Sequence, residues 1–452
     1  MAIVAEMEVQ ITSKKMIKPS SSELHLLKPF KLSLLDQLCT SKYNPAILFY
    51  AKPSDSNIDG SQFLDQLKQS LSKALTQFYP AAGRLKNNLF ITDFNEGVPY
   101  VEARVAGRLS DFIEQTEKLE AMNRLLPCPP YRYIQDPTTP QLAVQVNIFD
   151  CGGIALALCF FHKIFDGTTV YAFLNSWAAF SRGSNGEIPN PGLLGASSRL
   201  FPPIESMPES AALKSLFLND GRRKMTRSFV FDANAITTLV LKAKSKSLEH
   251  PSRALALSAF LWKHAIQASR SASGTLKPSI LGQAVNIRPR MKPQLPSYSI
   301  GNMFGMAISM YNPVGKDIDL SELAYLLREA TEGVPNDPQV VLQGFKTLTE
   351  QLSHLEEMVS KGDAEFYILS SLLNTVEANE DFGWGKPSLI SIPGIDSQNR
   401  EIRNLLYLKN ARQHNAVEAW VTLTEEEMGF LERDAHFLAC VSPNSHFGKS
   451  KI

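Results

Sequence analysis

The chain has 452 residues, of which 44% are hydrophobic and 20% charged, a composition typical of a globular protein long enough for two domains. Its 46 basic and 45 acidic residues almost cancel, and neither half forms a basic arm, which argues against nucleic acid or an anionic membrane as the main partner. The five cysteines are odd in number and lack CxxC spacing, which argues against a disulfide framework and a zinc site.

The N-terminal region lacks the apolar core of a signal peptide. No run of about eighteen uninterrupted apolar residues occurs, so no membrane span is expected. The sequence therefore predicts a reduced, soluble protein in the cytoplasm.

The first half of the chain mixes strand and helix patterns. A helix is expected at residues 62–78, where apolar side chains fall on one stripe, and it should stop at Tyr79-Pro80 because proline disfavours helical geometry in the residue before it. Residues 168–181 also have helical spacing. Strands are expected at residues 46–50, 98–106, 142–148 and 154–161.

The clearest local signal lies between residues 142 and 162. The first of its two strands alternates apolar and polar side chains, and residues 150–153, Asp-Cys-Gly-Gly, form a turn in which glycine can take positive φ. The second strand, 154–161, is a continuous apolar run, as expected for a strand buried on both faces, and it ends at His162.

From residue 183 to about residue 226, prolines, serines and glycines interrupt the pattern, and we interpret this stretch as a long crossover between domains. Regular patterns then resume. Strands are expected at residues 227–232, 280–287 and 417–423, and helices near residues 233–247, 253–269 and 425–433.

Residues 162–167, His-Lys-Ile-Phe-Asp-Gly, stand at a strand end before a helix, where α/β folds usually present reactive side chains. A neutral imidazole at His162 can take a proton from an alcohol near pH 7. Asp166 either bonds to the ring or holds the turn, and the sequence leaves both roles open. An ordinary core histidine is the alternative. A metal site lacks further ligands, and a serine hydrolase lacks its G-x-S-x-G elbow.

A second unusual segment is residues 381–385, Asp-Phe-Gly-Trp-Gly. Its two glycines allow a tight bend around a buried aromatic side chain. We interpret it as a mainly structural loop that supports the site around His162 from the other domain.

These two segments, in this order, resemble the defining HxxxDG and DFGWG motifs of the plant BAHD acyltransferase family, and the similarity covers nearly the whole chain. The branch it most resembles contains alkaloid and terpenoid O-acetyltransferases. Weaker blocks of the same resemblance are residues 32–37 (LSLLDQ), 78–85 (FYPAAGRL), 285–290 (VNIRPR), 301–302 (GN) and 417–420 (VEAW).

The resemblance implies two similar-sized α/β domains of the chloramphenicol acetyltransferase type, each a mixed sheet with flanking helices. We expect an N-terminal domain at residues 1–205, a crossover linker at 206–226, and a C-terminal domain at 227–452 that carries the DFGWG loop. The family's channel runs between the domains, with acyl-CoA entering at one end and the acceptor alcohol at the other. We expect a monomer that needs no metal.

The resemblance also assigns roles to single residues. His162 matches the catalytic base. The turn that aims it is supported by Asp166, by Gly167 and by Arg288, which is expected to pair with Asp166. Support at the coenzyme end is expected from Asp381, Gly383, Trp384 and Gly385.

Three further sets of residues follow from the same comparison. Ser252 and Arg253 match a region that contacts the phosphates of coenzyme A, and arginine suits phosphate recognition. Ser370 matches a hydroxyl that stabilises the oxyanion in relatives. Leu372 and Asn374 replace a tryptophan and an arginine that are usual there, which indicates an altered acceptor pocket or a reduced activity.

The expected function is direct transfer of an acyl group, preferably from acetyl-CoA, to a hydroxyl of an alkaloid, a terpenoid or a sugar ester. No acyl-enzyme is needed, because no activated serine or cysteine is evident. Two alternatives are an N-acyltransferase on the same scaffold and a non-catalytic paralogue that binds a metabolite.

Overall fold

The computed structural model describes residues 8–52, 60–114, 119–184, 194–205, 216, 221–292, 294–295, 299–313, 317–373, 380–392, 403–411 and 415–443. The chain divides into two compact units. The first comprises Met1–Glu209, Leu295–Met303 and Val376–Pro393, and the second comprises Ser210–Gln294, Phe304–Thr375 and Gly394–Ile452.

A six-stranded mixed sheet forms the centre of the first unit. Its strands stand in the order β1 (Val9–Ile17), β6 (Val98–Val105), β7 (Leu142–Phe149), β8 (Ile154–Phe161), β3 (Tyr43–Tyr50) and β13 (Leu389–Ser391). Only β6 and β7 run parallel, and the other neighbours are antiparallel. The sheet therefore brings β8, which precedes His162, to an interior position between β7 and β3.

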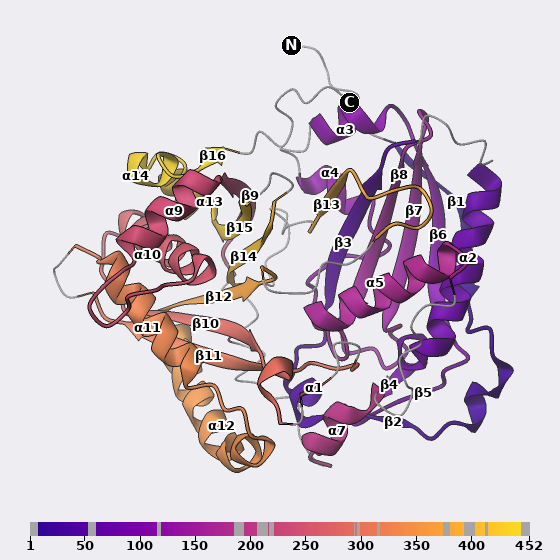
Figure 1. The fold of residues 1–452 in the computed structure, drawn as a ribbon, viewed down its shortest axis with the longest axis horizontal. Coiled ribbons are helices and arrows are strands. Elements are labelled where there is room, and N and C mark those ends of the chain that lie inside the picture. The colour runs from indigo at the N-terminus through magenta and orange to yellow at the C-terminus, as the bar shows by residue number, and fades with distance from the viewer. Residues whose placement is uncertain are drawn as a thin grey trace. The chain divides into compact units, whose positions relative to one another are not determined.

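Helices α2 (Gly60–Gln77) and α5 (Gly167–Ser181) pack against each other and cover one face of this sheet (Figure 1). Trp177 of α5 is fully buried and donates its indole N–H to Leu67 O (3.2 Å) and Ser70 Oγ (3.0 Å) of α2. The predicted stripe of α2 lies in the core, and the helix ends just before Tyr79-Pro80, as expected.

Shorter elements complete the first unit. They are η1 (Ser22–Leu26), α1 (Leu34–Leu38), η2 (Tyr79–Ala82), α3 (Leu109–Glu114), α4 (Leu119–Asn123), α7 (Ala196–Leu200), and a small sheet of β2 (Phe30–Lys31), β5 (Phe90–Thr92) and β4 (Arg84–Lys86).

The second unit is built on a seven-stranded mixed sheet. Its strands stand in the order β11 (Phe304–Tyr311), β10 (Ser279–Asn286), β12 (Glu365–Ser371), β14 (Asn404–Asn410), β15 (Val417–Thr424), β9 (Lys224–Phe231) and β16 (Ser442–Pro443). Strand β12 is parallel to both of its neighbours. Its helical elements are α9 (Ala233–Lys242), α10 (Arg253–Ser273), η3 (Arg288–Arg290), α11 (Leu320–Glu332), α12 (Pro338–Ser360), α13 (Glu425–Leu431) and α14 (Ala435–Leu438) (Figure 1).

The predicted fold class, two α/β units that each carry a mixed sheet with flanking helices, is confirmed. The helices and strands predicted from periodicity are all present. The helix predicted at 233–247 ends earlier, at Lys242, because the chain turns back through a bridge between Ser245 and Leu248.

The division of the chain differs from the expected one at the DFGWG loop. The segment Val376–Pro393 belongs to the first unit, not to a C-terminal domain at 227–452. The physical reason is the antiparallel pairing of β13 with β3, in which Leu389 stands opposite Phe49. Most of the expected linker, namely 206–215 and 217–220, lies outside the described residues. In the described part of the chain, no helix is long and apolar enough to span a membrane.

Candidate active site

His162 directly follows β8, a strand whose eight residues are all buried. Its backbone N–H donates to Lys42 O (2.9 Å), and the preceding Phe161 N–H donates to Gln141 O (2.9 Å). These bonds fix the backbone on both sides of the strand end. The side chain of His162 is partly buried.

The imidazole of His162 faces the side-chain amide of Asn302, with 3.1 Å between Nδ1 and Asn302 Oδ1. The amide nitrogen of Asn302 donates to the backbone carbonyl of His162 (2.7 Å). Because a carbonyl can only accept, this bond identifies which end of the amide is nitrogen, and the oxygen must face Nδ1. Nδ1 therefore carries the proton, and Nε2 keeps the lone pair that a base requires.

Burial, followed by the positive charge of Lys42, lowers the pKa of His162 to about 4. Desolvation disfavours the charged imidazolium, and a nearby cation acts in the same direction. The imidazole is therefore neutral near pH 7, which is the form that accepts a proton.

Asp166 is a structural residue in this arrangement. Its Oδ1 accepts from Thr169 N–H (2.9 Å) and caps α5, which begins at Gly167. Its Oδ2 accepts from the backbone N–H of Met303 (3.0 Å). The carboxylate thus joins the turn after His162 to the segment that carries Asn302.

The expected pairing of Asp166 with Arg288 stays a prediction. Arg288 begins η3 in the second unit and is buried. Its backbone N–H donates to Asn286 Oδ1 (3.1 Å).

Asp36 belongs to the same cluster, and sequence reasoning gave it no role. It is fully buried in α1, and its Oδ1 accepts from the backbone N–H of Asn302 (2.6 Å) and from Asn302 Nδ2 (3.1 Å). Its Oδ2 accepts from the N–H (2.9 Å) and Oγ (2.7 Å) of Ser33 in a capping box. The Ser-x-x-Asp spacing of a capping box was a readable signal, but it does not reveal Asn302.

Lys163, next to His162, is fully buried, and its Nζ donates to the backbone carbonyl of Gln37 (3.1 Å). Burial lowers the pKa of Lys163 to about 8 and that of Lys42 also to about 8. Of these two lysines with weakened basicity, Lys42 acts on the imidazole of His162, whereas Lys163 interacts with Cys39 and Asp36.

The DFGWG loop is tied into the core of the first unit. Asp381 Oδ1 accepts from Gly383 N–H (2.8 Å) and Gly385 N–H (2.9 Å), and both glycines take positive φ, of 102° and 84°. The buried aromatic is Phe382, whereas Trp384 is half-buried against Tyr50. These contacts make the loop a structural element, and its action at the coenzyme end stays a prediction.

Four other expected site residues lie in the second unit. Ser252 caps α10 by accepting from Leu255 N–H (3.2 Å), and Arg253 donates to Asn410 Oδ1 (3.2 Å). Ser370 stands in β12, half-buried, and Leu372 follows that strand. His162 lies in the first unit, so it stays a prediction that these four residues form one site with His162. Asn374 lies outside the described residues.

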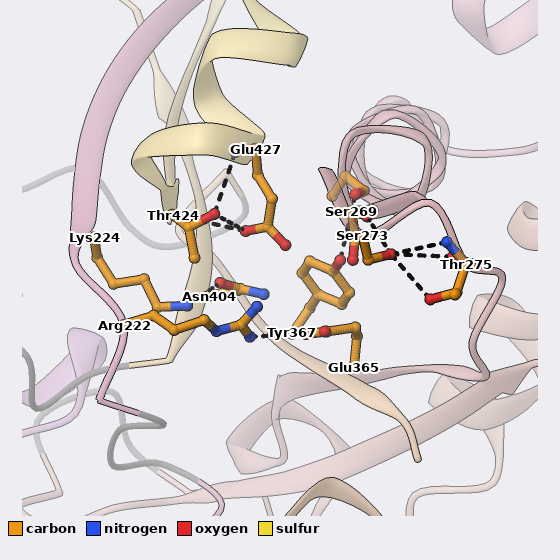
Figure 2. Close-up of polar contacts among 11 residues, drawn as sticks. Arg222, Lys224, Ser269, Ser273, Thr275, Glu365, Tyr367, Asn404, Thr424 and Glu427 are labelled. Carbon is orange, nitrogen blue, oxygen red and sulfur yellow. Dashed lines mark hydrogen bonds and ion pairs between the residues drawn. The ribbon is translucent and has the colours of Figure 1, made fainter. Parts of the chain in front are cut away.

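Figure 2 shows a group of polar contacts in the second unit. Lys224 Nζ donates to Asn404 Oδ1 (2.7 Å), and Arg222 pairs with Glu365 (3.1 Å). Lys224 is fully buried, so its charge needs a bonded partner, and Asn404 provides one. Arg222 is exposed, and its ion pair with Glu365 is partly solvated. We therefore assign these contacts a structural role within the second unit. Among the described residues, no group of three or more His, Cys, Asp or Glu side chains could hold a metal ion.

Two mixed α/β units, with a neutral histidine at the end of an interior strand of the first, agree with the architecture expected of a two-domain acyltransferase. The chain matches the Transferase family over residues 7–438 and belongs to this family, the BAHD acyltransferases. It is accordingly an enzyme that uses acyl-CoA as co-substrate.

The chain is similar to several named synthases and O-acetyltransferases over almost its whole length. It is 35% identical to akuammiline synthase 2 from Alstonia scholaris, covering 97% of this chain and 98% of that protein. It is also 35% identical to stemmadenine O-acetyltransferase from Catharanthus roseus, covering 94% and 97%. The crystal structure of vinorine synthase superposes with a TM-score of 0.79 at 34% identity, covering 96% of this chain and 99% of the other.

Proposed function

We propose that the chain transfers an acetyl group from acetyl-CoA to a hydroxyl of a plant alkaloid or terpenoid, with His162 as the general base. One observation supports the assignment of His162 as the general base. Its Nδ1 faces an amide oxygen, so that Nε2 is left as the proton acceptor. The similar proteins include stemmadenine O-acetyltransferase, whose name describes transfer to a hydroxyl, and this supports an ester as the product.

In the proposed reaction, Nε2 of His162 takes the proton of the acceptor hydroxyl while its oxygen attacks the thioester carbonyl. A tetrahedral intermediate forms, and its C–S bond then breaks. The departing thiolate of coenzyme A takes the proton from Nε2. An imidazolium with a depressed pKa releases that proton readily, so burial of His162 favours the second half of the reaction.

The remaining roles rest on the family resemblance. Ser370 is the proposed donor to the oxyanion, and Ser252 and Arg253 are proposed to contact the phosphates of coenzyme A. Leu372 and Asn374 are proposed to shape the acceptor side. A cytoplasmic, monomeric protein remains part of the proposal.

The test is to incubate wild type and His162→Ala with labelled acetyl-CoA and a panel of alkaloid alcohols, limonoid alcohols and matching amines. Products are identified by mass. Loss of a general base lowers kcat by about 10²–10⁴-fold. His354→Ala is the matched control, since His354 is exposed on α12. Thermal unfolding checks that both variants fold.

Folded His162→Ala with undiminished transfer would refute the base assignment. An amide as the main product would favour the N-acyltransferase alternative. Tight binding of alcohols by the wild type, without turnover of any donor, would favour the non-catalytic one.

A further inference from the structure

We propose that Asp36 is a positioning residue for the imidazole of His162 and acts on it through the side-chain amide of Asn302. The inference rests on the proposed function, because it concerns the base of that reaction. Three steps lead from the carboxylate to the ring.

The first step is the saturation of Asp36 by donors. Four hydrogen bonds reach its two oxygens, two from Ser33 and two from Asn302, at distances of 2.6–3.1 Å. An ionised carboxylate only accepts hydrogen bonds, and four lone-pair sites match four donors. The surroundings of this carboxylate are therefore arranged for its charged form.

The second step is the orientation of the Asn302 amide. Its nitrogen donates to Asp36 Oδ1 (3.1 Å) and to the carbonyl of His162 (2.7 Å). Rotating the amide by half a turn would place its oxygen against both of these acceptors and would lose both bonds. An ionised Asp36 thus opposes the rotation.

The third step is the consequence for the ring of His162. In the observed orientation, Asn302 Oδ1 accepts from Nδ1–H at 3.1 Å. In the rotated orientation, an N–H group would face Nδ1 and would favour the proton on Nε2. That tautomer has no lone pair where the base needs it.

The backbone around Asp36 and Asn302 is built for close approach. Gly301 has φ +123°, and a Cβ on it would lie 3.1 and 3.2 Å from the two carboxylate oxygens of Asp36. On the other side, Gln37 anchors α1 through bonds to the backbone of Asn88 and Ile204. These bonds fix the helix that carries Asp36.

The pH response of this arrangement involves a defined set of charges. Lys163 and Cys39 interact electrostatically with Asp36, and Lys42, Asp166 and His162 complete the group. Burial raises the pKa of Asp36 to about 6, against the lowering effect of its hydrogen bonds. We therefore expect kcat/KM to fall as Asp36 takes a proton below about pH 6, although His162 itself stays neutral down to about pH 4.

The test combines a spectroscopic readout of the ring with kinetics. Protein labelled with ¹⁵N-histidine gives long-range ¹H–¹⁵N signals that distinguish the Nδ1–H from the Nε2–H tautomer, and His162→Ala identifies the signals of His162 among the eight histidines. The variants are Asp36→Asn and Asn302→Ala. Asn147→Ala is the matched control, because Asn147 is a buried amide bonded to the backbone of Leu125 and Ala155.

The wild type is expected to show the Nδ1–H form. In Asp36→Asn and Asn302→Ala, a population with the proton on Nε2 should appear, and kcat should fall tenfold or more while KM changes less than twofold. Asp36→Asn should also lose the activity change near pH 6. Asn147→Ala should retain both the tautomer and kcat.

An unchanged tautomer with kcat within twofold in both variants would overturn the inference. If Asp36→Asn does not fold, the ring signals of the wild type recorded between about pH 5 and pH 7 decide, because protonation of Asp36 near pH 6 should increase the Nε2–H population, and ring signals that stay unchanged over this range would overturn the inference. The ¹H–¹⁵N signals of the imidazole also test the role of Asp36 separately from the role of His162 as the base. Should His162→Ala prove fully active, the proposed base is wrong, yet the tautomer still reports whether Asp36 positions the ring.

Discussion

Asp36 should give the enzyme an unusual dependence of stability on pH. Burial raises its pKa in the folded protein from 3.8 to about 6. A carboxyl with a raised folded pKa binds its proton more tightly when folded than when unfolded. Its contribution to stability is therefore fully present below about pH 4 and is lost as the pH rises through about 6.

The size of this effect follows from the shift. A difference of about two pKa units corresponds to about 3 kcal/mol of unfolding free energy, since one unit is worth about 1.4 kcal/mol. Most of this change develops between about pH 4 and pH 7. As the pH rises over this range, the unfolding free energy of the wild type should fall by about 3 kcal/mol relative to that of Asp36→Asn, because the amide does not titrate.

The assay is urea unfolding of wild type and Asp36→Asn at several pH values between about 4 and 8. The difference between the two proteins is measured at each pH, so that titration of all other groups cancels. The unfolding free energies of the two proteins should also differ by a constant amount at every pH, because an amide cannot accept all four hydrogen bonds. The test is therefore how their difference changes with pH. A difference that stays flat across this range would refute the assignment of a raised pKa to Asp36.

Three other substitutions have defined outcomes. Asp166→Ala removes the cap of α5 and leaves Met303 N–H without its acceptor, so thermal or urea unfolding should show a loss of about 2–4 kcal/mol, with kcat reduced. A loss below 1 kcal/mol would contradict this role. Gly301→Ala should cost about 1–3 kcal/mol and lower kcat, because φ is +123° and the new Cβ would contact Asp36; a neutral result would show that the loop can shift. Ser370→Ala should lower kcat by about 10²–10³-fold with unchanged stability if it stabilises the oxyanion, and full activity would remove it from that role.

The sequence predicted the position of the base because that position depends on local patterns. An uninterrupted apolar run specified β8, and His162 is simply the residue that follows it. The cap of α5 by Asp166 and the bend at Gly383 and Gly385 are also local. Each of these features involves residues within a few positions of each other, where spacing alone carries the information.

The partners of the base were not predictable in the same way. Asn302 is 140 residues from His162, and Asp36 is 266 residues from Asn302. Their contacts arise only because Leu295–Met303 returns to the first unit from within the second. The same reason explains why the loop at 381–385 was placed in the wrong domain. The hydrophobic periodicity of such a segment does not indicate which unit it will join.

The strongest consequence of this long-range arrangement is that Asp36 and Asn302 should act as one unit. If Asp36 affects the ring only through the amide, it has nothing to act on once that amide is removed. We therefore expect Asp36→Asn to lower kcat in the wild-type background but to leave it within about twofold in the Asn302→Ala background. The matched comparison is Asp36→Asn combined with Asn147→Ala, where Asp36→Asn should lower kcat by the same factor as in the wild-type background. If the effects of Asp36→Asn and Asn302→Ala multiply as well, then Asp36 reaches the site by another route, and the chain from carboxylate to amide to imidazole is wrong.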